Sequence, residues 1–136
     1  MDYGVEDLAK GASEVLNKGG VIVYPTETVY GLGGNALEES VVSKIFKIKC
    51  RPEGKPVIVL VRDLAMAKGL IDLGEYEETL KKYWPGALTG VFKAITKLPS
   101  GVVSKGGTVA IRISPHPFVQ KLFGYIDFPI ISTSAN

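Results

Sequence analysis

Two short apolar runs constrain the fold of this chain more than any other feature. Val21–Tyr24 and Val57–Val61 are continuous and rich in β-branched residues. Runs of this kind are typical of strands that are buried on both faces of a sheet. Segments with apolar residues at helical spacing, over 5–16 and 37–49, precede them. This alternation predicts an α/β or α+β fold, in which helices pack on a mixed sheet.

Further segments extend the pattern along the chain. Helices are expected at 63–70, 75–84 and 115–123, strands at 88–94, 108–113 and 129–132, and loops at 25–35 and 97–107. We expect Asp63 to cap its helix, and His116, between two prolines, to start its helix rather than to act as a base. Because no repeat or low-complexity linker divides the chain, we expect one domain over residues 1–136.

Composition limits the kind of protein that this chain can be. Its 136 residues are 46% hydrophobic, enough for a buried core, and its net charge is only +2, so an anionic partner must be held by a local cluster. One cysteine and one histidine are too few for a His/Cys metal site. The N-terminus has no secretion signal and no apolar run is long enough for a bilayer, so we expect a cytoplasmic protein.

A cluster of cations follows the second predicted helix. Five of them lie within residues 44–55: Lys44, Lys47, Lys49, Arg51 and Lys55. Cations at a helix C-terminus are favoured by the helix dipole, so a solvated helix end is one interpretation. However, Pro52 constrains the backbone beside Lys49 and Arg51, and a lysine and an arginine held close together suit a phosphate.

Hydroxyl groups and an arginine follow or end three of the predicted strands. Thr26 comes directly after the first strand, and Ser132, Ser134 and Asn136 lie at the end of the chain. Each group could form an ordinary turn, or it could bind phosphate and carboxylate oxygens.

Alternation along 108–112 puts Arg112 on the same face as Thr108, as an exposed edge arginine or as part of a cavity. Together these residues favour a site that positions anionic substrates and stabilises developing phosphate charge.

At these residues the sequence resembles the YrdC-like family, the threonylcarbamoyl-adenylate synthases of transfer RNA modification. The matching motifs are VIVYPTETVYGLGGNA (21–36), KIKCRPEGKPVIVLV (47–61), YWPGALTGVFK (83–93), GGTVAIRISPHP (106–117) and PIISTSAN (129–136). They occur in the family's order and cover nearly the whole chain. The combination is far more specific than any one of these short motifs.

The resemblance implies a twisted mixed sheet around a deep, positively charged cavity. It also implies a nucleotidyltransferase reaction in which L-threonine, bicarbonate and ATP, with Mg²⁺, give threonylcarbamoyl-AMP and pyrophosphate. The residues expected to bind threonine are Thr26, Arg112 and Ser132. Those expected to bind ATP are Lys49, Arg51, Thr108, Ser134 and Asn136, with Lys49 and Arg51 also catalytic and no protein ligand for a metal.

The chain departs from the family pattern at several points. Cys50 stands where glycine is common, Leu60 where many members have a histidine that contacts threonine, and Ala87 where proline is frequent. Losing an imidazole removes a hydrogen bond, so we expect an effect on threonine affinity. The family also continues beyond the final S-x-N motif, so a member lacking the last segments is expected.

Two other functions are compatible with the same residues. One is a non-catalytic module that binds double-stranded RNA, tRNA or a nucleotide through the cation cluster. The other is a non-catalytic subunit that pairs with a protein partner through an unpaired edge strand at 129–132.

Overall fold

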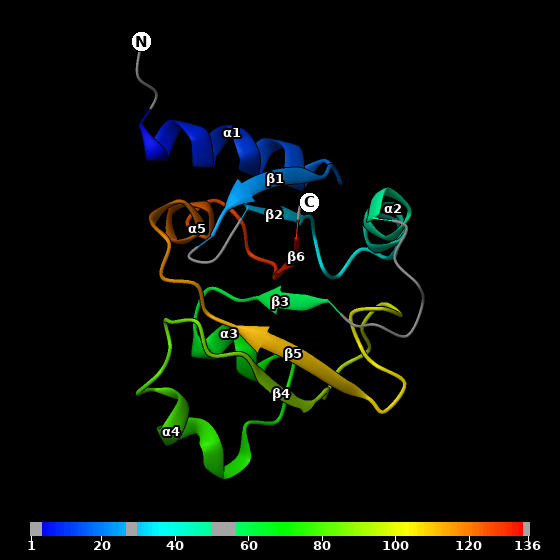
Figure 1. Ribbon diagram of the computed structural model, residues 1–136, viewed down its shortest axis with the longest axis vertical. Coiled ribbons are helices and arrows are strands. Elements are labelled where there is room, and N and C mark those ends of the chain that lie inside the picture. The colour runs from blue at the N-terminus through cyan, green and yellow to red at the C-terminus, as the bar shows by residue number, and fades with distance from the viewer. Residues whose placement is uncertain (1–3, 27–29, 50–56, 135–136) are drawn as a thin grey trace.

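A computed structural model describes residues 4–26, 30–49 and 57–134 of the chain. Six strands form one mixed sheet in the order β1-β2-β6-β3-β5-β4, and helices pack on it (Figure 1). The strands are β1 (Ile22–Pro25), β2 (Tyr30–Gly33), β3 (Ile58–Leu60), β4 (Gly90–Lys93), β5 (Thr108–Arg112) and β6 (Ile130–Ser134). The helices are α1 (Val5–Asn17), α2 (Glu39–Lys49), α3 (Leu64–Lys68), α4 (Glu77–Leu80), α5 (Pro117–Leu122) and the 3-10 helix η1 (Gly74–Tyr76). The predicted fold class is confirmed.

β6 lies in the middle of the sheet, antiparallel to both β2 and β3. Ile130 and Ile131 point to opposite faces, and both are fully buried. A strand with apolar residues on both faces must be covered on both sides, which a central position provides. The prediction of an unpaired edge strand at 129–132 is therefore wrong, and the protein-partner hypothesis loses the strand edge on which it was based.

The first two strands differ from the prediction in two ways. β1 is an edge strand, and Val23 is 62% exposed, so burial of this run on both faces is wrong. Residues 30–33, expected in a loop, form β2 and pair antiparallel with β1. Glycine is depleted in strands, so Gly31 and Gly33 concealed this strand in the sequence.

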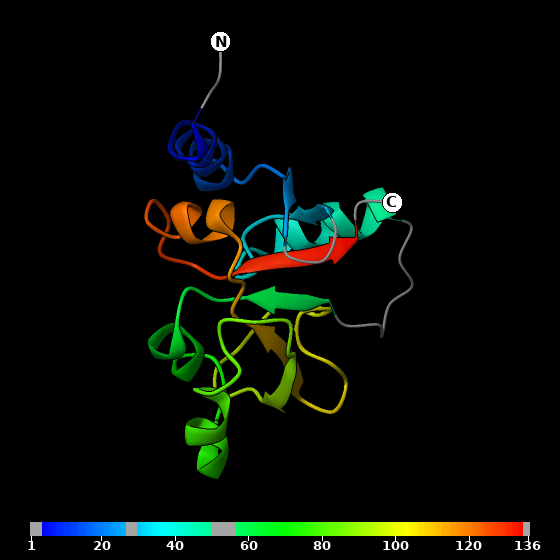
Figure 2. The same cartoon turned by 60° about the vertical axis from the view of Figure 1, so that its left-hand side comes forward.

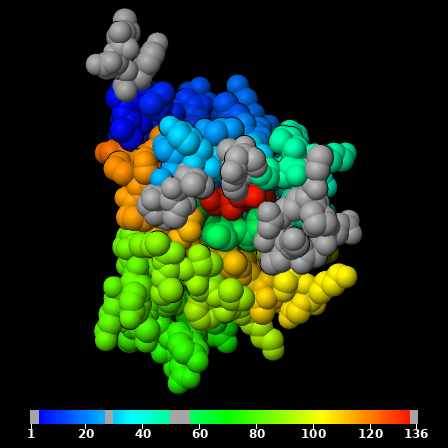
Figure 3. All heavy atoms as spheres, in the orientation of Figure 1, coloured from blue at the N-terminus to red at the C-terminus, as the bar shows by residue number. Residues whose placement is uncertain are grey.

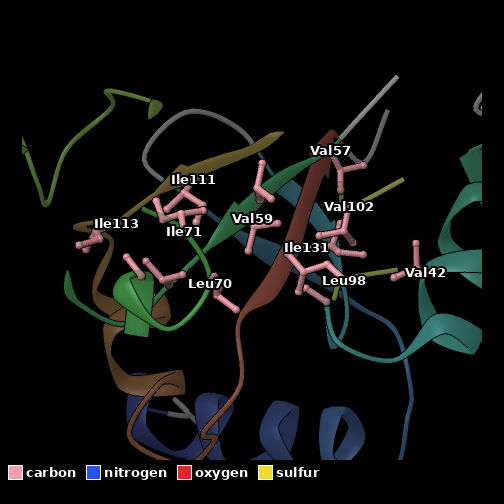
Figure 4. Close-up of a cluster of buried hydrophobic side chains, with 14 of the residues drawn as sticks. Val42, Val57, Val59, Leu70, Ile71, Leu98, Val102, Ile111, Ile113 and Ile131 are labelled. Atoms are coloured by element: carbon pink, nitrogen blue, oxygen red, sulfur yellow. The ribbon is translucent and has the colours of Figure 1, made fainter. Parts of the chain in front are cut away.

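One face of the sheet is covered by a large apolar cluster. Figure 4 shows Val59 of β3, Ile111 of β5 and Ile131 of β6 in it, beside Val42 of α2 and Leu70 after α3. Val57 to Val61 flank or form β3, and four of the five side chains, at 57, 59, 60 and 61, are at most 1% exposed. The predicted buried strand at 57–61 is confirmed.

The opposite face is covered at one end by α1 and α5, which lie side by side (Figures 1 and 2). Leu16 and Phe118 from these helices pack in a second apolar cluster with Leu60 and Ile130 from the sheet. At the surface, Glu6 of α1 accepts a hydrogen bond from the Tyr125 hydroxyl and forms an ion pair with Lys121 of α5. These two contacts lower the pKa of the Glu6 carboxyl.

The helix caps agree with the sequence. The Asp63 carboxylate accepts a hydrogen bond from the Met66 N–H at 2.9 Å, and His116 Nδ1 accepts one from the Phe118 N–H at 3.1 Å. In place of the helix expected at 75–84, the structure has the short 3-10 helix η1 followed by α4, which ends at Leu80. Among the described residues, none of the helices is long and apolar enough to cross a membrane.

Candidate functional site

β5 carries the candidate arginine on the face that the sequence predicts. Thr108, Ala110 and Arg112 alternate with Val109 and Ile111, which point into the large apolar cluster on the other face. Arg112 is only 6% exposed. A guanidinium cannot release its charge in a protein, so a buried arginine favours a carboxylate or phosphate beside it.

The strand register sets the distance between the arginine and the serine of β6. Arg112 of β5 pairs with Leu60 of β3, and Leu60 pairs with Ile130 of β6. Ser132 is two residues further along β6, opposite Ile58. Strands are about 4.8 Å apart, and residues i and i+2 about 6.8 Å, so the Cα atoms of Arg112 and Ser132 are about 12 Å apart. Arg112 and Ser132 therefore lie on the same face of the sheet, opposite to the large apolar cluster.

Three other candidates lie at the opposite end of the sheet from Arg112. Ser134 lies opposite Gly31 at the start of β2, and the hairpin that carries Thr26 joins β1 to β2 at this end. Thr108 starts β5 at the same end, because β5 and β3 are parallel and β6 runs against both. Figure 2 shows β6 pointing towards this end, near α2.

Lys49 is held near the same end by packing at the C-terminal half of α2. The Phe46 ring lies against Gly101, where a Cβ atom would clash with it, and the Gly101 carbonyl accepts a hydrogen bond from the Val57 N–H at 3.2 Å. Val57 directly precedes β3, and Lys49 lies about 4.5 Å further along the helix from Phe46. The structure thus brings Lys49 towards the end of the sheet that carries Thr108 and Ser134.

The Thr108 hydroxyl has a defined partner that the sequence did not indicate. It lies 2.8 Å from the Ser104 hydroxyl, which also accepts a hydrogen bond from the Thr108 N–H at 3.1 Å. Ser104 lies in the polar, glycine-rich segment before β5, where several serines and glycines gave no signal that would single it out. Ser104 therefore fixes the orientation of the Thr108 hydroxyl.

Leu60, which stands where many family members have a histidine, is fully buried opposite Arg112. It packs with Phe118 and Ile130 in the second apolar cluster. The surroundings of the arginine are thus apolar at this position, which strengthens electrostatic attraction to an anion but adds no hydrogen bond.

Figure 3 shows a hollow in this face of the molecule, with β6 (red) and β3 (green) at its base. Cyan residues of the first hairpin form its upper side and yellow-green residues around β4 its lower side. Arg51 and Asn136 lie outside the described residues, and for Ser134 only the strand position is described. Their roles, and the deep basic cavity, stay predictions.

Comparison with known proteins assigns the family. The Sua5/YciO/YrdC family model, described as "Telomere recombination", matches residues 14–136. A threonylcarbamoyl-AMP synthase of Blochmanniella floridana is 39% identical over 132 residues, which cover 93% of this chain and 69% of the relative.

Two solved structures share the fold. The crystal structure of Pyrococcus abyssi Sua5 complexed with L-threonine has a TM-score of 0.90 and 36% identity, covering 96% of this chain and 39% of that protein. The structure of E. coli YciO has a TM-score of 0.85 and 28% identity, covering 97% and 65%. The sequence motifs, the sheet and these matches agree, and the chain belongs to the Sua5/YciO/YrdC family.

Proposed function

We propose that this chain makes L-threonylcarbamoyladenylate from L-threonine, bicarbonate and ATP, as a threonylcarbamoyl-AMP synthase for tRNA modification. The observation that carries the proposal is buried Arg112 on the same face of the sheet as Ser132, with Lys49, on a helix that packs against the opposite face, held towards the end of the sheet that carries Ser134. Two anionic substrates must be brought together in this reaction, and Arg112 and Lys49 offer a cation for each. Relatives named for this activity support the assignment.

The threonine side of the site consists of Arg112 and Ser132; Thr26, which the resemblance also assigns to it, lies at the other end of the sheet from Arg112. Arg112 would bind the substrate carboxylate, because its planar guanidinium matches the two carboxylate oxygens. Ser132 would hydrogen-bond the rest of the amino acid. The L-threonine in the similar Pyrococcus abyssi Sua5 structure supports this choice of substrate.

The ATP side consists of Lys49, Arg51, Thr108, Ser134 and Asn136. Lys49 and Arg51 would hold the phosphates and stabilise the charge that grows at the α-phosphate in the transition state. Thr108, fixed by Ser104, would contact the nucleotide. Fixed cations need no reorganisation during the reaction, so they lower its barrier.

The reaction balances without a covalent enzyme intermediate. The threonine amine adds to the carbon of bicarbonate and water leaves, which gives a carbamate. A carbamate oxygen then attacks the α-phosphorus of ATP, the bond to the bridging oxygen of the β-phosphate breaks, and pyrophosphate leaves. The protein's part is to hold the two reactants in line.

The candidate residues fit a Mg²⁺ ion that arrives with ATP. They are cations, hydroxyls and one amide, and among the described residues no group of three or more His, Cys, Asp and Glu side chains could hold a metal. Phosphate oxygens and water satisfy Mg²⁺ with few protein ligands, and the ion would neutralise phosphate charge. A non-catalytic module for RNA or nucleotides is less favoured, since the relatives are named as synthases.

The test is product formation with a matched pair of lysine variants. The protein is incubated with L-threonine, bicarbonate and MgATP, and pyrophosphate and the adenylate are measured by mass spectrometry. We expect product from the wild type and from Lys47→Ala, and about 100-fold less from Lys49→Ala. No product above the Lys49→Ala level, where a full-length relative is active, would contradict the proposal.

A further inference from the structure

We infer that Tyr24 is a positioning residue for Ser132, an inference that rests on the proposed threonine site. Tyr24 is fully buried, and its hydroxyl donates a hydrogen bond of 2.9 Å to the carbonyl oxygen of Ile131. Ile131 directly precedes Ser132 in β6. A fixed carbonyl orients the peptide plane between these two residues, and therefore the Cα atom that carries the serine side chain.

The Tyr24 ring reaches across a whole strand to make this bond. Tyr24 lies on β1 and Ile131 on β6, with β2 between them. A Cβ atom on Gly33 would lie 2.7 Å from the ring, and one on Gly31 would lie 3.3 Å from the ring and 3.4 Å from the Ser132 hydroxyl oxygen. The missing side chains of β2 therefore make room for the phenol, which lies beside Ser132.

Ile131 and the ring are also held by other contacts. The Ile131 N–H donates a hydrogen bond of 2.9 Å to the Gly34 carbonyl, so both polar groups of Ile131 are bonded on the β1–β2 side. The ring stacks on Phe118 of α5 at 6.3 Å between centroids and an interplanar angle of 26°. Tyr24 thus links the first hairpin, β6 and α5.

The hydroxyl has a role distinct from that of the ring. A phenylalanine would fill almost the same volume and keep the stacking on Phe118, so packing alone does not require a tyrosine. What only the hydroxyl adds is a directional bond to a strand that carries a candidate substrate ligand. Small displacements of such a ligand weaken binding, because hydrogen bonds depend steeply on distance and angle.

The experiment compares Tyr24→Phe with Tyr125→Phe, which removes an exposed hydroxyl that bonds to Glu6 of α1. Calorimetry gives the Kd of L-threonine and of MgATP, and amide hydrogen exchange reports on residues 131–133. For Tyr24→Phe we expect a Kd for L-threonine about threefold higher, less than the loss from removing the Ser132 hydroxyl itself, an unchanged Kd for ATP, and faster exchange at Ser132 and Thr133. For Tyr125→Phe we expect none of these changes.

The outcomes separate the inference from the proposed function. Unchanged exchange in β6 would overturn the positioning role, whatever the activity. Faster exchange with unchanged L-threonine affinity would leave Tyr24 as a structural residue and overturn its role in substrate binding. If the wild type binds no L-threonine and forms no product, the proposed function fails and the role in substrate binding fails with it, while exchange still decides whether Tyr24 holds β6.

Discussion

The two faces of the sheet consist of alternate residues of the same strands, but they differ in composition and exposure. Val59, Ile111 and Ile131 pack on one face in a continuous apolar cluster. On the other face, apolar cover from α1 and α5 reaches Leu60 and Ile130, and polar candidates such as Ser132 lie beyond it, partly exposed. The comparison shows that the packed face holds the strands whose opposite face carries the candidate substrate residues, so effects on stability and on activity are expected at different residues.

The largest expected effect comes from opening the packed face. Ile111→Ala removes a fully buried side chain from β5 and leaves a cavity, so we expect a loss of about 2–5 kcal/mol in the free energy of unfolding. Val91→Ala is the control, because Val91 lies on the other face of the sheet and is 63% exposed. Urea denaturation measures both. An equal loss in the two variants would contradict the difference between the faces.

The next largest effect is expected from the loss of Arg112, on the face of the sheet opposite to the large apolar cluster. Arg112→Met keeps the length of the side chain but removes the charge, so we expect L-threonine affinity to fall about 10- to 100-fold. Arg62→Met, at an exposed arginine paired with Asp63, should leave the affinity unchanged. Calorimetry of L-threonine binding to the folded variants measures this. Unchanged affinity in Arg112→Met would remove this residue from the threonine site.

A smaller effect is expected from the serine of β6. Ser132→Ala removes one hydroxyl without a change of backbone, and one hydrogen bond is worth about 1 kcal/mol, which is about fivefold in Kd for L-threonine. Ser43→Ala on the exposed side of α2 is the matched control. If both serine variants bind L-threonine as the wild type does, Ser132 makes no contact with the substrate.

The smallest effect concerns the cap of α3 and its dependence on pH. The Met66 N–H lowers the pKa of the Asp63 carboxyl below its ordinary value of 3.8. A lowered pKa in the folded state means that the charged cap stabilises the protein fully above about pH 5 and is lost as the pH falls through the folded-state pKa.

We therefore expect the small difference in Tm between wild type and Asp63→Asn at about pH 6 to shrink as the pH falls to about 2. Asparagine keeps the cap hydrogen bond without the charge, so the comparison isolates the carboxylate. A difference that stays constant with pH would show that the charge does not contribute.

Local patterns in the sequence predicted the features that depend on neighbouring residues. The alternation along 108–112 was enough to place Arg112 opposite the core-facing residues, and Asp63 and His116 were identified as helix starts from their own surroundings. The family motifs contain the residues of the candidate site. None of these predictions depends on which strands are neighbours in the sheet.

Features that depend on distant parts of the chain could not be predicted. The glycines of β2 made this strand look like a loop in the sequence. They are needed because side chains there would clash with the Tyr24 ring from β1. The central position of β6 follows from pairing with two segments far away in the sequence. The position of Lys49 depends on contact between Phe46 and Gly101, which no local pattern reports.

The central position of β6 also has a consequence for biosynthesis. In the part of the chain that the structure describes, the strand order joins the first hairpin to β3, β5 and β4 only through β6. Gly31 of β2 can pair with Ser134 of β6 only after roughly a hundred further residues have been synthesised. Pairings between such distant residues form slowly. Before β6 is made, the first hairpin, next to Thr26, and the strand that carries Arg112 share no strand pairing among the described residues, so we expect the candidate substrate site to be completed only when β6 is inserted between them.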